Sequence, residues 1–209
     1  IFSRVINGGR ISLTVGIAVS LVSVGIGLVL GLLAGYIRLL DALIMRVMDG
    51  LMAIPGILLA IALISLSGAS LTTVIIAIVI PEVPRVVRLV RAVVLTVREE
   101  AYVEAAIAAG TNLTNIMVRH ILPNTIAPLI VQATYVCASA MLTESILGFL
   151  GAGVPPEIPS WGNIMSEGRT FFQICPWIIF FPGVALAITV MSVNIVGDGL
   201  RDTLDPRIA

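Results

Sequence analysis

Long apolar runs separated by shorter polar segments set the pattern of this chain. Five runs approach or exceed the length of about 20 residues with which a helix crosses the ~30 Å hydrocarbon core of a bilayer. Hydrocarbon offers no water to pair backbone N–H and C=O groups, so helices that satisfy their own backbone are expected there. The predicted spans run from 11 to 36, 45 to 66, 71 to about 95, 121 to 150, and 171 to about 199. The pattern predicts an all-α, polytopic membrane helix bundle with about five transmembrane helices, in a single domain over residues 1–209.

Two of the connections between these spans are longer than the others. Residues 97–120 are polar and helical in pattern, whereas residues 151–170 are rich in proline and glycine. Proline has no backbone N–H, and its ring clashes with the preceding turn of a helix. Because Pro155, Pro156 and Pro159 stand close together, residues 151–170 are predicted to form an ordered but non-helical loop.

Glycine recurs along the first predicted span. Gly27, Gly31 and Gly35 are four residues apart and share one helix face, where small residues let a second helix approach closely. Glycine is also frequent in membrane helices without any such role. Both interpretations therefore stay open for this span: the glycines form a packing face, or they have no specific role.

Composition agrees with a lipid environment and narrows the function classes. Apolar residues make up 58% of the 209 residues and charged residues only 11%, against about 25% charged residues in soluble domains. The 12 acidic and 12 basic residues cancel, so the net charge points to no nucleic-acid partner. Cys137 and Cys175 have no CxxC or metal-ligand spacing and are expected to be small buried residues.

The distribution of arginine predicts the orientation in the membrane, because cytoplasmic segments carry an excess of arginine and lysine. If residues 97–120 are cytoplasmic, alternation of the spans leaves Arg4, Arg10 and Arg169 outside. The other nine arginines then lie on or near the cytoplasmic side: Arg38, Arg46, Arg85, Arg88, Arg91, Arg98, Arg119, Arg201 and Arg207. Residues 97–120 are accordingly predicted to be cytoplasmic and residues 151–170 extracytoplasmic.

Residues 97–120 contain the signals of two short helices joined at a glycine. Glu99 and Glu100 suit the positive end of a helix dipole. Gly110 suits the left-handed geometry that ends a helix, and Thr111 or Asn112 can cap the helix that follows.

The first of these two helices has a surface suited to docking. Ala105 and Ala106 let another backbone come near, Tyr102 and Ile107 offer apolar anchors, and Glu104 offers a charge. Such a helix is suited to lying in a groove of a partner protein. The chain has no GxxxxGK[ST] sequence with which to cradle ATP phosphates, so its energy source must lie elsewhere. We expect no enzymatic activity, cofactor or metal on this chain.

Six residues form a spaced pattern across this stretch: Glu104, Ala105, Ala106, Gly110, Leu122 and Pro123. They resemble the EAA loop of ABC importer permeases. His120 stands where the general motif has isoleucine, although RHILPN is similar to the form found in the dipeptide, oligopeptide, nickel and glutathione branch. The resemblance implies a coupling helix pair that contacts a partner ATPase through five residues: Tyr102, Glu104, Ala105, Ala106 and Gly110.

Other stretches are similar to the same branch: FSRVINGGRISL at 2–13, MRVMDGLMAIPGILLAIAL at 45–63, ESILGFLGAGVPPEIPSWGNIMSEGR at 144–169 and NIVGDGLRDTLDPR at 194–207. The last resembles the C-type, or second, of two permease subunits. Such subunits carry a further N-terminal helix, and this chain starts with Ile1 rather than Met, so we expect that helix to be lacking here. IRLLD at 37–41 and PEVP at 81–84 depart from the usual family pattern, which leaves their local geometry open.

The resemblance implies a permease subunit of an ATP-driven importer that forms half of a translocation pathway for peptides or a related small solute. The implied partners are a second homologous permease in a heterodimer, two ATP-binding subunits, an extracytoplasmic solute-binding protein and the lipid bilayer. The implied location is the bacterial or archaeal cytoplasmic (inner) membrane. Dipeptides, oligopeptides, nickel chelates and glutathione all stay open as solutes.

Two acidic residues within the predicted spans leave alternatives open. Glu144 lies mid-span, where a charge is costly. It is expected either to face the subunit interface or pathway, or to form a structural hydrogen bond inside the bundle. Glu82, beside Pro81, is predicted to cap a helix break or to face an interface.

A gradient-driven secondary transporter is the main alternative function, but it needs intramembrane ionisable residues and usually shows inverted repeats. Only these two residues qualify, and no repeat is evident. A non-transporting scaffold is a third class.

Overall fold

The computed structural model describes residues 2–204, and these residues form helices with no strand among them. The helices are α1 Phe2–Tyr36, α2 Arg38–Met52, α3 Gly56–Ser67, α4 Leu71–Val97, α5 Ala101–Ala108, α6 Leu113–Ile116, the π-helical turn η1 Met117–Ile121, α7 Leu122–Phe149, α8 Trp161–Thr170 and α9 Trp177–Leu204. The all-α prediction is confirmed. Arg207 and the end of the 194–207 similarity lie outside the described residues.

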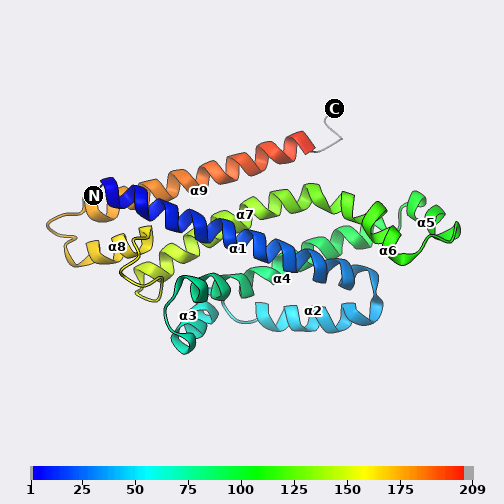
Figure 1. Ribbon diagram of the computed structural model, residues 1–209, viewed down its shortest axis with the longest axis horizontal. Helices are drawn as coiled ribbons and strands as arrows, with labels where there is room; N and C mark the ends of the chain where they lie inside the picture. Colours follow the sequence, from blue (N-terminus) through cyan, green and yellow to red (C-terminus); the bar gives the residue numbers. More distant parts are fainter. Residues whose placement is uncertain (1, 205–209) are drawn as a thin grey trace.

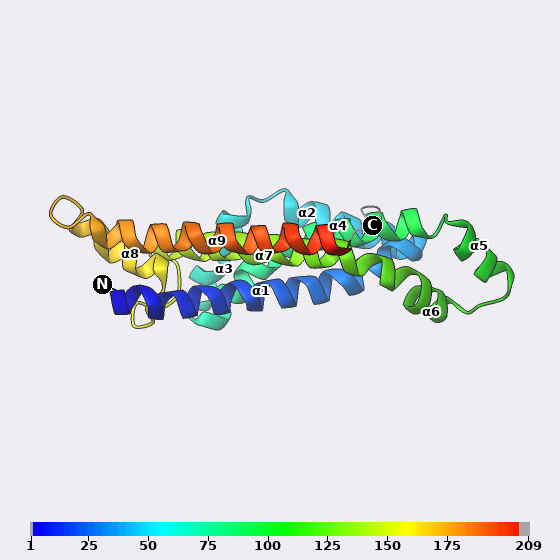
Figure 2. The same ribbon diagram turned by 90° about the horizontal axis from the view of Figure 1, so that it is seen from above.

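The helices form an elongated bundle (Figures 1 and 2). Helices α5 and α6 project from one end, and α8 lies at the other end beside the N-terminus. Three helical stretches are long and apolar enough to cross a membrane: Phe2–Tyr36, Leu113–Phe149 and Trp177–Thr203. The bent pair α2 and α3 makes a fourth if it counts as one span. Helix α4 has 27 residues but carries an acid and three arginines in its sequence. The number of five spans therefore stays a prediction.

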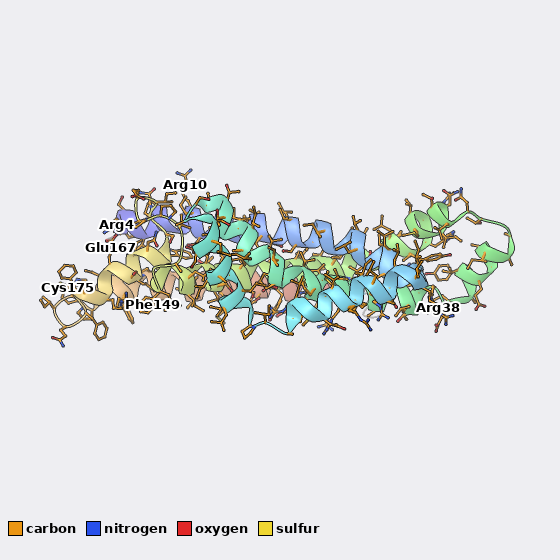
Figure 3. All side chains as sticks on the ribbon, turned by 90° about the horizontal axis from the view of Figure 1, so that it is seen from below. Arg4, Arg10, Arg38, Phe149, Glu167 and Cys175 are labelled. Carbon is orange, nitrogen blue, oxygen red and sulfur yellow. The ribbon has the colours of Figure 1, made fainter. Side chains whose placement is uncertain are left out.

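The four charged side chains labelled in Figure 3 lie toward the two ends of the bundle. Arg4, Arg10 and Glu167 lie at the end that carries α8, and Arg38 lies toward the end that carries α5. This arrangement groups Arg4 and Arg10 apart from Arg38, as the arginine distribution predicts. Which end faces the cytoplasm stays a prediction.

The glycine face of α1 packs against a valine ridge of α4. A Cβ atom added to Gly27, Gly31 or Gly35 would lie 2.5, 2.6 or 2.5 Å from the Cβ of a valine on α4. The three valines are Val86, Val90 and Val94, which are fully or almost fully buried. Such distances leave no room for a side chain, so the packing role of these glycines is confirmed. This contact positions α4, from whose end the 97–120 segment projects.

The predicted span 45–66 is not one straight helix. Helix α2 ends at Met52, α3 begins at Gly56, and the two axes are bent by 86°. Pro55 lacks an N–H, and the residue before a proline avoids the α conformation, which together explain the break. The prediction of a continuous helix over this run was wrong because apolar residues on both sides of Pro55 conceal the interruption.

Helix α4, in contrast, continues through Pro81 and Pro84. The predicted helix break at Glu82 was therefore wrong. Prolines are tolerated within membrane helices because neighbouring groups satisfy the freed backbone atoms.

The segment 151–170 is only partly a loop. Its second half forms α8, whose N-cap is Ser160, so the prediction of a non-helical segment was wrong from Trp161 onward. All three prolines lie before Ser160 and place no constraint on the helix after it. Helix α9 likewise begins at Trp177 rather than at Phe171, directly after Pro176.

Candidate functional site

The segment 97–120, here named the elbow, begins where α4 ends. Glu100 has an extended backbone (φ −74°, ψ 139°) and starts α5. At the end of α5, the Gly110 N–H donates to the Ile107 carbonyl at 2.9 Å, and the Thr111 N–H donates to the Ala106 carbonyl at 3.1 Å. These two hydrogen bonds, with Gly110 at φ +80°, form a Schellman motif. The predicted termination of the first helix at Gly110 is confirmed.

The second short helix of the elbow has a side-chain cap. The Asn112 side-chain oxygen accepts a hydrogen bond from the Asn115 backbone N–H at 3.0 Å. Of the two predicted capping residues, Asn112 fills the role. The elbow is therefore two short helices defined mainly by local hydrogen bonds.

Only two apolar side chains of the elbow's helices are fully or almost fully buried. Val103 on α5 is 0% exposed and Ile116 on α6 is 2% exposed. On the outward side, three large apolar side chains remain between 44% and 48% exposed: Tyr102, Ile107 and Leu113. The elbow thus has exposed apolar side chains, and its helices α5 and α6 project from the end of the bundle (Figure 2). An exposed apolar surface of this kind is typical of a protein-protein contact.

The other predicted contact residues are also accessible. Glu104 and Ala105 are exposed, Ala106 is partly exposed and Gly110 is exposed. Glu104 forms no ion pair within residues 2–204. A Cβ added to Gly110 would meet nothing within 4 Å, so the glycine is required by its backbone angle and not by crowding.

A contact that the sequence did not reveal ties the elbow to the start of α7. The Asn124 side-chain amide donates to the Tyr102 hydroxyl at 3.1 Å and to the His120 carbonyl at 2.7 Å. The Tyr102 and His120 rings lie 6.1 Å apart. Asn124 is the last residue of the RHILPN stretch. Its position beside the motif was the only signal in the sequence that could have pointed to this contact.

Glu144 lies far from the elbow and inside the bundle. It is 0% exposed, and the Ser12 hydroxyl donates to one of its carboxylate oxygens at 2.8 Å. The Trp161 backbone N–H in turn donates to the Ser12 hydroxyl at 3.4 Å. Glu144 therefore joins α7 to α1 and to the start of α8. This placement favours the structural alternative over a role at the interface or pathway.

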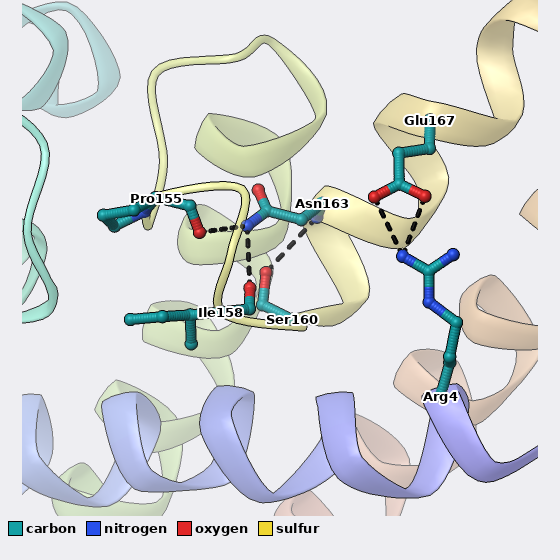
Figure 4. Close-up of polar contacts among 6 residues, drawn as sticks. All are labelled: Arg4, Pro155, Ile158, Ser160, Asn163 and Glu167. Atoms are coloured by element: carbon teal, nitrogen blue, oxygen red, sulfur yellow. Dashed lines mark hydrogen bonds and ion pairs between the residues drawn. The ribbon is translucent and has the colours of Figure 1, made fainter.

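The segment 151–170, here named the Pro-rich loop although its second half is α8, lies at the opposite end of the bundle (Figure 1), and Figure 4 shows the contacts that hold it. The Asn163 side-chain amide donates to the carbonyls of Val154, Pro155 and Ile158 at 3.0 to 3.1 Å. The Ser160 hydroxyl accepts from the Asn163 backbone N–H at 3.2 Å. Figure 4 also shows Arg4 of α1 paired with Glu167 of α8, at 2.8 Å.

Within residues 2–204 no group of three or more histidine, cysteine, aspartate or glutamate side chains is arranged to hold a metal ion. Cys137 is buried and Cys175 is partly exposed, and the two are free thiols. The chemistry of the described residues is therefore that of helix packing, ion pairs and an exposed contact surface.

Known proteins with similar sequences are transport permeases. The family described as "Binding-protein-dependent transport system inner membrane component" matches residues 27–209. A probable peptide ABC transporter permease protein of Sinorhizobium fredii is 56% identical over 99% of this chain and 71% of its own length. A dipeptide transport system permease protein of Alkalihalophilus pseudofirmus is 46% identical over 100% of this chain and 69% of its own length.

The fold is similar to that of a solved ABC importer. A chain of the MetNI methionine ABC transporter in an inward-facing conformation matches with a TM-score of 0.73, at 20% identity, over 95% of this chain and 96% of that chain. Taken with the sequence matches, the likeness sets aside the gradient-driven carrier. The chain belongs to the family of binding-protein-dependent transport system inner membrane components, and it is an inner-membrane permease subunit of an ATP-driven ABC importer, which works with ATP-binding subunits and is not itself an enzyme.

Proposed function

We propose that this permease subunit passes peptides or related small solutes, and that its elbow is the surface on which an ATP-binding subunit docks. The names of the relatives from Sinorhizobium fredii and Alkalihalophilus pseudofirmus support the peptide class. The observation that carries the docking proposal is the exposure of the apolar side chains of Tyr102, Ile107 and Leu113 on two short helices that project from the end of the bundle.

The contact would combine three kinds of surface. Tyr102 and Ile107 supply apolar area, and Glu104 supplies a charge without a partner among the described residues. Ala105 and Ala106 keep the surface low enough for another backbone to approach. A helix with such a surface suits a groove in a partner protein.

The proposed assembly contains this chain, a second homologous permease and two ATP-binding subunits. ATP shifts the transporter between inward-open and outward-open states only if the ATP-bound partner favours one state over the other. A solute-binding protein would deliver cargo at the end that carries the Pro-rich loop, which places that loop outside the cytoplasm. The chain itself would need no cofactor.

The docking proposal is tested by comparing two glycines that both have a positive φ. Gly110→Val should abolish co-purification of the ATP-binding subunits with the solubilised transporter and stop peptide uptake, because valine strains the turn that orients α5. Gly68→Val is the matched control, since Gly68 has φ +82° against +80° for Gly110 and both have open space around the Cβ position. It should leave the ATP-binding subunits attached.

Membrane insertion of both variants is checked by carbonate extraction of membranes. Full retention of the ATP-binding subunits by the Gly110 variant would count against the elbow as their docking surface.

A further inference from the structure

A row of ion pairs on α2 and α4 lies outside the elbow and the Pro-rich loop. Arginines recur at every third position of α4, and each pairs with an acid. The pairs, here named the ion-pair row, are Arg85 with Glu82, Arg88 with Asp49 and Arg91 with Asp41. Asp41 and Asp49 belong to α2, which lies alongside α4 (Figure 1).

The depth of this row follows from the contact between α1 and α4. Gly27 of α1 meets Val86 of α4, so Arg85 lies at about the level of Ile26. Ile26 is near the middle of the uncharged run from 11 to 36. Arg85 is also about 18 Å from Val97, the last residue of α4, because an α-helix rises by about 1.5 Å per residue. With α1 and α4 taken as spans, both measures put Arg85 near the middle of the bilayer.

Two surfaces at this depth therefore have opposite character. On α1, Leu21, Ile26 and Val29 are exposed apolar residues suited to lipid. On α4, the Arg85 side chain is 46% exposed, and Arg88 one turn closer to the elbow is 44% exposed. A charge that faces lipid at mid-depth is costly, and such residues usually face a bundle interior or a water-filled cavity. The face of α4 that carries the row must then turn away from lipid.

Arg85 differs from Arg91 in its unused hydrogen-bond donors, and from Arg88 in having a buried acid as its partner: the Glu82 side chain is 7% exposed and that of Asp49 is 59% exposed. Arg91 donates from two nitrogens to both oxygens of Asp41, whereas Arg88 donates from Nη2 alone to Asp49 at 2.6 Å. Arg85 uses only Nη1, at 3.1 and 3.3 Å from the Glu82 oxygens, and its other nitrogens have no partner within residues 2–204. Glu82 is itself 5% exposed and also accepts from the Ser139 hydroxyl at 3.1 Å. Glu82 is thus a fixed, buried anchor that leaves the outer edge of the guanidinium free.

We infer that the ion-pair row lines the water-filled route through the transporter and that Arg85 binds the carboxylate of a passing peptide. The inference rests on the proposed peptide function. A guanidinium presents donors in a planar fork that matches a carboxylate, and every unmodified peptide carries a C-terminal carboxylate. Contact at mid-depth would make Arg85 a residue that selects cargo within the membrane.

The lining of the route is tested by thiol labelling of the assembled transporter. In a background of Cys137→Ala and Cys175→Ser, cysteine replaces either Arg85 or Ile26, which have similar depth and similar exposure of 46% and 42%. A charged methanethiosulfonate reagent needs water to reach and ionise the thiol. It should label Arg85→Cys at least roughly ten-fold faster than Ile26→Cys, because a thiol in lipid stays protonated.

Removing Arg85 alone leaves Glu82 buried without its cation, so the labelling is repeated with Glu82→Gln/Arg85→Cys. This pair carries no buried charge, and co-purification with the ATP-binding subunits checks its assembly. Equal labelling of the positions 85 and 26 in both backgrounds would overturn the inference, since the row would then face lipid or a dry subunit interface.

The carboxylate contact is tested by peptide uptake in two neutralised variants. Glu82→Gln/Arg85→Gln should raise the apparent KM for a dipeptide about ten-fold, as expected for loss of a charge-assisted hydrogen bond. Asp41→Asn/Arg91→Gln is the matched control, because Arg91 already donates from two nitrogens to both Asp41 oxygens, and it should change KM much less. Equal effects of the two variants would contradict a specific role for Arg85.

Absence of dipeptide uptake by the wild-type transporter would overturn the proposed peptide function and the carboxylate contact with it. The labelling contrast would stand in that case, because it reports on water at Arg85 and does not depend on the cargo.

Discussion

The elbow and the Pro-rich loop are both polar connections between long helices, yet they are held in different ways. The elbow is shaped mainly by hydrogen bonds between near neighbours, such as Asn112 with Asn115 and Gly110 with Ile107. Its longer-range hydrogen bonds come from exposed or partly buried side chains, those of Asn124 and Arg98. The Pro-rich loop is held to the bundle by residues distant in sequence. The Trp161 indole N–H donates to the Val5 carbonyl at 2.9 Å, and the Trp161 side chain is 4% exposed.

This difference indicates which end of the subunit is adapted to move with a partner. A segment built from local hydrogen bonds keeps its own shape when its position relative to the bundle changes. A segment held by long-range contacts cannot shift without breaking them. We therefore expect the elbow to move as a small rigid unit, and the Pro-rich loop to move only with α1 and α7.

The sharpest test of this comparison is the removal of one aromatic side chain from each segment. Trp161→Ala should destabilise the subunit by about 3–5 kcal/mol, because it deletes a buried indole together with its hydrogen bond to the Val5 carbonyl. Tyr102→Ala, which removes a side chain that is 47% exposed, should cost less than about 1 kcal/mol. Thermal unfolding in detergent measures both.

The control for the first change is Trp177→Ala, since Trp177 is 48% exposed and begins α9. It should shift the unfolding temperature only slightly. Similar losses for Trp161→Ala and Tyr102→Ala would mean that the two segments are equally integrated into the fold.

The elbow was predictable because its signals are local. Gly110 ends α5 through its own backbone angle, and Asn112 caps α6 through a residue three positions away. The glycine face of α1 was also visible as a spacing, although its partner ridge of valines on α4 was not. A feature that depends on one residue and its neighbours can be predicted from the sequence. The position of that feature relative to other helices cannot.

The parts that sequence did not predict depend on contacts between distant residues or on competing local signals. Ser12 and Glu144 are 132 positions apart, so the burial of Glu144 inside the subunit had no signal in its own segment. The ion pair of Asp41 with Arg91 spans 50 positions. The predictions at Pro55 and at Pro81 failed in opposite directions. One proline breaks a helix and the other lies within one, and neighbouring packing decides between the two outcomes.

A smaller effect is expected from the two helix caps, which compare the segments without changing a large side chain. Ser160 caps α8 and is fully buried, whereas Asn112 caps α6 and is exposed. Each replacement by alanine should cost about 1 kcal/mol of helix stability. For Ser160→Ala this cost should lower the unfolding temperature of the whole subunit, because α8 is part of the packed bundle.

For Asn112→Ala the cost should stay local. The unfolding temperature should be unchanged, while hydrogen exchange at the amides of α6 becomes faster and retention of the ATP-binding subunits becomes weaker. A lowered unfolding temperature for Asn112→Ala would show that the elbow unfolds together with the bundle.

The smallest effect on stability is expected for a substitution of Glu104. Such a substitution should affect only the binding of the partner. Its carboxylate is exposed and forms no ion pair within residues 2–204, so Glu104→Arg should change the free energy of unfolding by less than about 0.5 kcal/mol. Glu99→Arg is the control, because Glu99 is also exposed but lies in the turn before α5. If Glu104 meets the partner, its variant alone should reduce peptide-stimulated ATP hydrolysis several-fold in reconstituted vesicles. Equal reductions in the two variants would mean that the partner senses the net charge of the elbow and not the surface of α5.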